Sequence, residues 1–181
     1  MALINTTTTG VLGSTFYADG SGDLTIQQNG ALVNKITSNG LTYRGTGSVL
    51  QVVSNTTSTQ VSTTSGSYVT TGLTASITPS SASNKILVLV NLGSMFNNAG
   101  TQQLVVAIFR GATNLHAAAG GFGGQLYSGS AIEATMSMMI LDTPATTSST
   151  TYTVHYAAVS GTATFNVNTG NSYIILQEIA G

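Results

Sequence analysis

The chain has 181 residues, enough for one globular domain with a short appendage. Only 4 residues are Lys or Arg and 5 are Asp or Glu, so 5% of the chain is charged, where a soluble protein usually has about 25%. Nucleic acid and anionic membranes are therefore poor partners, because only Lys35, Arg44, Lys85 and Arg110 could neutralise phosphates. The chain has 0 Cys, which excludes disulfides and thiolate metal sites.

No stretch of the sequence predicts a membrane span or an export signal. The longest apolar runs, residues 86–90 and 104–109, fall far short of the roughly 20 residues that a membrane helix needs. The opening MALINTTTTG has neither the basic nor the apolar region of a secretory signal. We therefore expect neither a membrane nor nucleic acid among the partners.

Residues 1–47 carry the signals of short strands and tight turns. Strands are predicted at residues 24–28, 31–37 and 41–43. Each pair of neighbours is separated by an Asn-Gly dipeptide, the strongest two-residue hairpin signal. The large apolar residues of this part are too few for an independent core.

We therefore predict that residues 1–47 are an attachment or shaft segment, held in a groove on a partner by its apolar side chains. Its short strands could also pair with the edge of a neighbouring sheet through backbone hydrogen bonds. The predicted anchor residues are Leu3, Ile4, Val11, Leu12, Phe16 and Tyr17.

From residue 48 the segments become longer and more apolar, and we predict a sandwich of two sheets over residues 48–181. Pro79 and Pro144 fall between the predicted strands, where they interrupt no ladder. No segment keeps the i, i+3, i+4, i+7 pattern of an amphipathic helix beyond one turn, so the predicted fold class is all-β. The predicted strands are residues 49–53, 68–71, 73–78, 85–92, 103–110, 132–141, 151–159, 162–168 and 173–179.

Alternation along one of these strands predicts a sheet with a wet side. Tyr152, Val154 and Tyr156 form its apolar face, while Thr153 and His155 occupy the other face. Such a strand can lie at the surface of the sandwich.

Three other predicted strands, at residues 85–92, 104–109 and 173–179, are apolar on both faces. A strand of a two-sheet sandwich has only one inward face, so the second apolar face needs another cover. We expect subunit association to supply that cover.

The order of these segments resembles the jelly-roll knob of the tumour-necrosis-factor and complement-type trimers. SASNKILVLVNLGSMF is similar to the central apolar strand of that fold, and QLVVAIFRGATNL to its next pair, a hairpin with Arg110-Gly111 at the turn. MSMMILDTPATTSSTTYTVHY is similar to its paired strands and TFNVNTGNSYIILQEIAG to its closing hairpin. The resemblance implies a jelly-roll sandwich that associates as a homotrimer.

Other segments resemble tail-fibre and virion proteins of marine and freshwater bacteriophages, in which a short N-terminal attachment or shaft segment carries a trimeric knob. These are NTTTTG, GSGDLTIQQNG, LTYRGTGSVLQVV and ITPSSASNKILVLV. The resemblance implies a structural protein on the virion surface, a short fibre or a capsid decoration made in the host cytoplasm, with capsid or tail proteins as partners. The alternative is a receptor-binding tail-fibre adhesin for a host surface glycan or protein.

Candidate ligand residues for a metal are few. Asp19 and Asp23 flank glycines like the start of a calcium loop, but the loop lacks Gly at its sixth position and Glu at its twelfth. A zinc site would need His116, His155 and carboxylates brought together by the fold. We therefore predict no metal and no cofactor.

A glycine-rich stretch, AAAGGFGG, follows His116. It is not a phosphate loop, because no Lys-Ser/Thr pair and no helix follow it. One interpretation is a long flexible loop between strands. The other is a contact loop whose glycines let Phe122 and Tyr127 present flat faces to a sugar or a protein.

The acidic residues do not predict an enzyme. Fibre enzymes that cut polysaccharides use paired carboxylates on a large scaffold, whereas only Glu133, Asp142 and Glu178 lie beyond residue 47. Glu178 falls in an otherwise apolar strand, so we expect Arg110 or Lys85 as its partner. No catalytic residue is predicted.

Overall fold

The computed structural model describes residues 46–98, 102–117 and 121–181, and the backbone of four short strands before residue 43. At residues 102 and 169 it also describes the backbone only. The chain divides into two compact units, residues 1–50 with 180–181 and residues 51–179. We describe each unit by itself.

The first unit contains an antiparallel sheet in the order β1–β2–β3–β4. Its strands are β1 (Thr15–Ala18), β2 (Leu24–Gln28), β3 (Ala31–Thr37) and β4 (Gly40–Thr42). The last three confirm the predicted strands, shifted by one residue at β4, whereas β1 was not predicted. Backbone hydrogen bonds also join Gly47 and Ser48 to Ala180.

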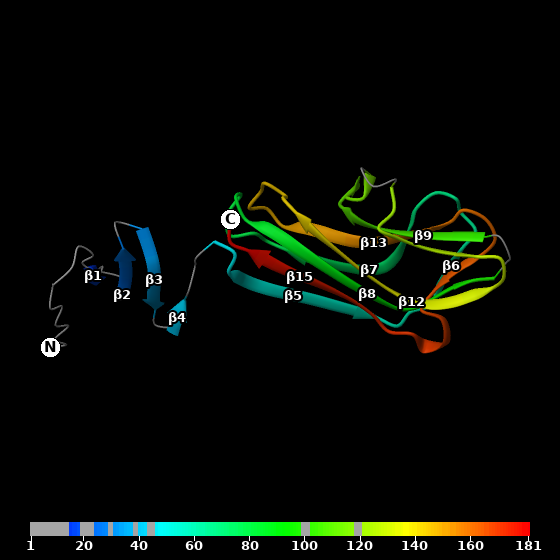
Figure 1. The fold of residues 1–181 in the computed structure, drawn as a ribbon, viewed down its shortest axis with the longest axis horizontal. Helices are drawn as coiled ribbons and strands as arrows, with labels where there is room; N and C mark the ends of the chain where they lie inside the picture. Colours follow the sequence, from blue (N-terminus) through cyan, green and yellow to red (C-terminus); the bar gives the residue numbers. More distant parts are fainter. Residues whose placement is uncertain are drawn as a thin grey trace. The chain divides into compact units, whose positions relative to one another are not determined.

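The second unit contains two sheets. One has the order β5–β15–β8–β14–β6, and β12 pairs with the other edge of β8 (Figure 1). Its strands are β5 (Val49–Thr57), β6 (Val61–Thr63), β8 (Lys85–Asn97), β12 (Ile132–Asp142), β14 (Ala163–Phe165) and β15 (Ser172–Ile179). The other has the order β10–β9–β13–β7, and β11 also pairs with β9. Its strands are β7 (Val69–Ile77), β9 (Gln102–Arg110), β10 (Thr113–Asn114), β11 (Gly124–Ser128) and β13 (Thr150–Ala158).

The pairing of the longer strands is nested. Among β5, β7, β8, β9, β11, β12, β13 and β15, the first pairs with the last, the second with the next to last, and so on inward. Thus β5 pairs with β15, β7 with β13, β8 with β12 and β9 with β11. A folded-over hairpin of this kind is a jelly roll. The predicted all-β jelly-roll sandwich is confirmed.

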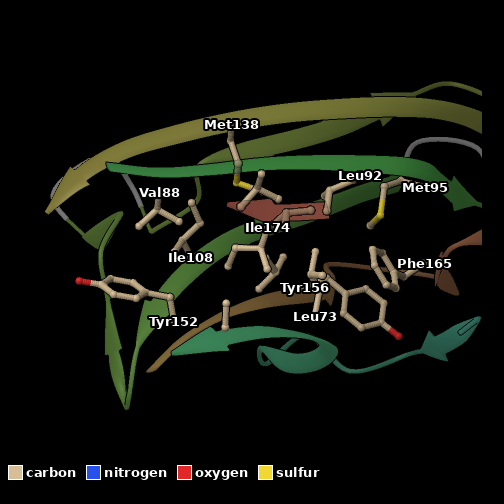
Figure 2. Close-up of a cluster of buried hydrophobic side chains, with 14 of the residues drawn as sticks. Leu73, Val88, Leu92, Met95, Ile108, Met138, Tyr152, Tyr156, Phe165 and Ile174 are labelled. Carbon is tan, nitrogen blue, oxygen red and sulfur yellow. The ribbon is translucent and has the colours of Figure 1, made fainter. Parts of the chain in front are cut away.

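The core lies between the two sheets. Figure 2 shows Leu73, Tyr152 and Tyr156 of one sheet facing Val88 and Ile174 of the other, and all of these side chains are fully buried. They alternate along their strands with outward residues, which is why each sheet has one inward face. Burying each such side chain contributes about 1.5–3 kcal/mol.

Two features of the sequence end or bend strands in ways that were not predicted. Gly72 has a φ of 81°, and it bends β7 where the register with β13 shifts, so the two predicted strands at 68–71 and 73–78 are one. Asn166 and Asn168 have φ values of 54° and 51°, which end β14 in a 3₁₀ turn instead of continuing it to residue 168.

Candidate subunit interface

The outer face of the β5–β15–β8–β12 sheet is apolar. Along β8, Ile86, Val88 and Val90 point inward and are buried, so Leu87 and Leu89 point outward, where both are partly exposed. On β5, Val53 packs against the core, so its neighbour Val52 points outward. The second apolar face that was predicted for residues 85–92 is therefore present on β8.

The strand register aligns the outward residues of β12, β8 and β15 in three rows. The rows are Leu141–Leu87–Gln177, Met139–Leu89–Ile175 and Ser137–Asn91–Tyr173. Met139 is 71% exposed, Leu141 53% and Tyr173 45%. Large side chains with this much exposure, aligned across neighbouring strands, form a continuous apolar surface rather than scattered single residues.

A depression of about 380 Å³ lies in this surface. Asn91 and Ser137 are its polar lining residues, and the Asn91 Nδ2 donates a hydrogen bond of 2.8 Å to the Ser137 Oγ. The other lining side chains are mainly apolar, so the depression offers mainly apolar contact. Its lining side chains include Leu89, Asn91, Ser137, Met139, Tyr173 and Ile175.

The Arg110–Asp142 ion pair connects the two sheets at one end of the sandwich. The Arg110 Nη1 lies 2.8 Å from the Asp142 Oδ2, and the Tyr152 hydroxyl donates to the same oxygen at 2.7 Å. Burial raises the pKa of Tyr152, and its hydrogen bond to the carboxylate raises it further. Asp142 is on β12, whereas its partners are on β9 and β13, so the contact is structural.

Among the described residues no cation pairs with Glu178, which corrects the expectation of Arg110 or Lys85. It is 1% exposed, and four neutral donors bind its carboxylate: the Gln51 Nε2 at 2.6 Å, the Ser80 N at 2.6 Å, the Ser80 Oγ at 2.8 Å and the Asn84 Nδ2. Burial alone would raise the pKa of Glu178, but these hydrogen bonds together lower it below its ordinary value. Neutral donors can therefore hold a buried carboxylate in place of an ion pair.

The outer face of β9 is covered by the chain itself, which corrects the prediction that this strand needs a second subunit. Val105 and Ala107 point outward yet are buried. Phe109 stacks on His155 with ring centroids 4.2 Å apart and meets the Tyr68 ring edge-on at 5.4 Å. Burial lowers the pKa of His155.

The loop that contains the glycine-rich stretch ends before the last glycine of that stretch, because β11 begins at Gly124. Phe122 is half-buried and precedes this strand, whereas Tyr127 lies within it and is 67% exposed. Phe122 and Tyr127 therefore come from different local structures, the end of the loop and the strand, and a shared contact role for them stays a prediction.

Two of the predicted anchor residues, Phe16 and Tyr17, lie in β1. Phe16 pairs with Ile26 and Tyr17 with Thr25 in the β1–β2 ladder. Within the ranges that the structure describes, no group of three or more His, Asp or Glu could hold a metal ion. The same residues include no helix long and apolar enough to span a membrane. The residues that lie outside the described ranges are Leu3, Ile4, Val11, Leu12, Asp19 and Asp23.

The contribution of β12 to the apolar face was not predicted. Its outward residues Met139 and Leu141 are among the most exposed large apolar side chains of the described residues. The signal was present, since Met138 and Ile140 alternate with them and make this strand apolar on both faces. Met138 packs in the core (Figure 2).

No protein-family model matches the sequence, and no curated protein matches it. Among solved structures, the VP2 subviral particle of infectious bursal disease virus is similar at 12% identity and a TM-score of 0.40, covering 90% of this chain and 48% of that one. Endospore appendages of Bacillus are similar at 12% identity and a TM-score of 0.29, covering 77% of this chain and 96% of that one. The chain spans about half the length of the VP2 chain.

Proposed function

We propose that the protein is a structural component of a virus particle surface, and that it assembles as a homotrimer through the outer face of the β5–β15–β8–β12 sheet. The observation that carries the proposal is the set of exposed apolar residues aligned across β12, β8 and β15. A surface of this kind is costly to leave in water and is typical of an interface.

A second and third copy suit this face better than a charged partner does. The depression has no charged side chain in its lining, so it offers nothing to select a basic or acidic surface. The jelly-roll order supports the same choice, because the knobs that the sequence resembles associate as trimers. A stable interface should bury well over about 1,000 Å² in total.

We further propose that residues 1–47 attach the protein to capsid or tail proteins of the particle, with the knob at residues 48–181 facing outward, as a short fibre or a capsid decoration. The antiparallel sheet of short strands β1 to β4 supports this division. Deletion of residues 1–47 should give a protein that no longer incorporates into particles, measured by immunogold labelling of intact virions. Incorporation of the truncated chain would place attachment in the knob.

A second function, attachment to a host cell surface as an adhesin, is favoured by one further observation. Tyr127 presents an aromatic ring that is 67% exposed and lies in the other sheet, on β11, apart from the proposed interface. We propose no enzymatic activity, because the carboxylates of the second unit already have structural contacts. Glu133 accepts from Ser94, Asp142 pairs with Arg110, and Glu178 accepts from neutral donors.

The mass of the full-length protein in solution tests the proposed assembly. We expect light scattering to give three times the chain mass of 18.4 kDa at micromolar concentration. A stable monomer would contradict the homotrimer, and a stable dimer would replace it with a two-fold interface.

A further inference from the structure

A neutral patch with one exposed aromatic ring lies where β9, β11 and β13 end together. Tyr127 is the cross-strand partner of Gln103, and the Val159 N donates a hydrogen bond to the Gln103 O. The Gln103 Nε2 donates to the Gln125 Oε1, which fixes the two amides beside each other. Tyr127 is 67% exposed and Val159 54%, so the ring and the amides are open to solvent.

This patch lies at the end of the sandwich opposite Glu178. Glu178 binds Ser80, in the loop that follows β7, and β7 ends at Ile77 beside the start of β13. The patch lies at the other end of β13, beyond Ala158. Gln51, the first residue of the second unit, hydrogen-bonds to Glu178, so within this unit the patch lies at the end opposite the first residue.

Four of the five charged side chains of the second unit are gathered away from the patch. Its charged residues are Lys85, Arg110, Glu133, Asp142 and Glu178. Asp142 and Glu178 both pair with Ile86 across the ladder, and Lys85 precedes Ile86 in the chain. Arg110 binds Asp142, so these four charged residues share the end of the sandwich that contains Glu178. Glu133 is on the other sheet and accepts a hydrogen bond from Ser94. The side chains that form the patch are therefore all uncharged, and they offer no charge with which to bind an acidic or a basic ligand.

An exposed ring beside paired amides has the chemistry that recognises a neutral sugar. A Tyr ring is a rigid apolar surface with a polar tip, so it can stack on the C–H face of a hexose ring at small entropic cost. Gln side chains carry both donors and acceptors, which match the hydroxyl groups of a sugar. A second copy of the chain fits this patch less well than it fits the face of β8, because the apolar surface here is one ring and one Val side chain.

We propose that Tyr127, Gln125 and Gln103 form a contact site for a neutral glycan on a cell surface. The inference rests on the second function proposed above, attachment, and does not depend on the interface between copies. Tyr127 would stack on the sugar ring, and the two glutamines would bind its hydroxyl groups.

Saturation-transfer NMR on the full-length protein tests the site, with neutral oligosaccharides of glucose, galactose, mannose and N-acetylglucosamine as probes. We expect at least one probe to bind, Tyr127→Ala to weaken it about tenfold or more, and Tyr127→Phe to retain most of it, because the ring supplies the contact. Gln125→Ala should weaken binding less than Tyr127→Ala does. Ser76→Ala is the matched control, an exposed residue near the other end of the same sheet, and it should bind like the wild type.

The inference is overturned if none of the neutral probes binds, or if Tyr127→Ala binds them as the wild type does. Binding that is restricted to sialylated or sulfated oligosaccharides, tested in parallel, would also overturn it. Light scattering on the same samples separates this result from the assembly: loss of the trimer with sugar binding intact contradicts the interface only, and a trimer without sugar binding contradicts the glycan site only.

Discussion

The two outer faces of the sandwich come from strands with similar sequences but differ in how they are covered. β8 and β9 are both apolar on both faces. On β9 the outward Val105 and Ala107 are buried by the chain itself, whereas on β8 the outward Leu87 and Leu89 stay partly exposed beside Met139. A strand that is apolar on both faces therefore does not identify an interface until the cover within the same chain is known.

The rest of the sheet that contains β9 shows how a chain with 5% charged residues can present a polar face. The Thr74 and Thr153 hydroxyl oxygens are 3.0 Å apart, and those of Ser76 and Thr151 are 2.7 Å apart, each pair bridging β7 and β13. Hydroxyl groups paired across strands still have lone pairs and protons for water. This face therefore presents hydroxyl groups to water, whereas the outer face of β8 presents apolar side chains.

The largest expected effect comes from a charge placed on the apolar face. Met139→Asp should abolish the trimer, because assembly would bury an unpaired carboxylate, while the monomer keeps its fold since Met139 is 71% exposed. Sedimentation velocity and circular dichroism measure the two properties. Ser76→Asp, on the hydroxyl face, is the matched control and should remain trimeric. A trimeric Met139→Asp variant would remove β12 from the interface.

A core substitution should affect folding as well as assembly, which distinguishes the inward from the outward face of the same sheet. Phe165 is fully buried, and Phe165→Ala should lower the free energy of unfolding by about 3–5 kcal/mol through lost burial and the cavity it leaves. Denaturant titration followed by circular dichroism checks this. A loss below about 1 kcal/mol would mean that the distal end of the core is loosely packed.

A smaller effect is expected at Glu178. Glu178→Gln directs an NH2 group at a site where the surrounding groups are donors, and it should cost about 1–3 kcal/mol. Because the pKa of Glu178 in the folded state is lowered from 4.5, its carboxylate stabilises the fold above that pH, and the contribution is lost as the pH falls through the folded pKa. Thermal melts from neutral to acid pH should therefore show a steeper decline for the wild type than for Glu178→Gln. Parallel curves would show that the carboxylate is not the group that titrates.

The smallest expected effect is that of a chelator. Within the described residues no cluster of His, Asp or Glu is suited to a metal ion, and we expect EDTA to leave the melting temperature of the full-length protein unchanged. A clear decrease would indicate a cation bound elsewhere in the chain, with Asp19 and Asp23 as the first residues to replace.

Strand positions and the class of fold could be predicted from sequence because period-2 alternation and turn residues are local signals. The break at Gly72 could not be interpreted correctly, since the same glycine can end a strand or bend it, and only the partner strand β13 decides. The partner of Glu178 was mistaken for a similar reason. Charge balance suggested Arg110 or Lys85, but the donors come from Gln51, Ser80 and Asn84, which only the fold brings together.

The apolar face itself was predicted in part. Alternation along β8 and β15 indicated a second apolar face, and the register then aligned it with β12. The same reasoning failed for β9. Its outward Phe109 packs against Tyr68 and His155, which come from a loop and a strand far away in sequence. Contacts at long sequence separation are the part that local patterns do not specify.

The accessibility of position 139 in the assembled protein tests the central claim most directly. The chain has 0 Cys, so a Met139→Cys variant carries one thiol, and the Ser76→Cys variant is its matched control. Met139 is 71% exposed in the single chain, so we expect protection of this thiol in the trimer to come from another copy. With the trimer verified by light scattering in the same sample, we predict that Met139→Cys reacts with a bulky thiol reagent much more slowly than Ser76→Cys, and at the same rate as Ser76→Cys once both are unfolded. Equal rates in the assembled state would contradict the assignment of this face as the interface between copies.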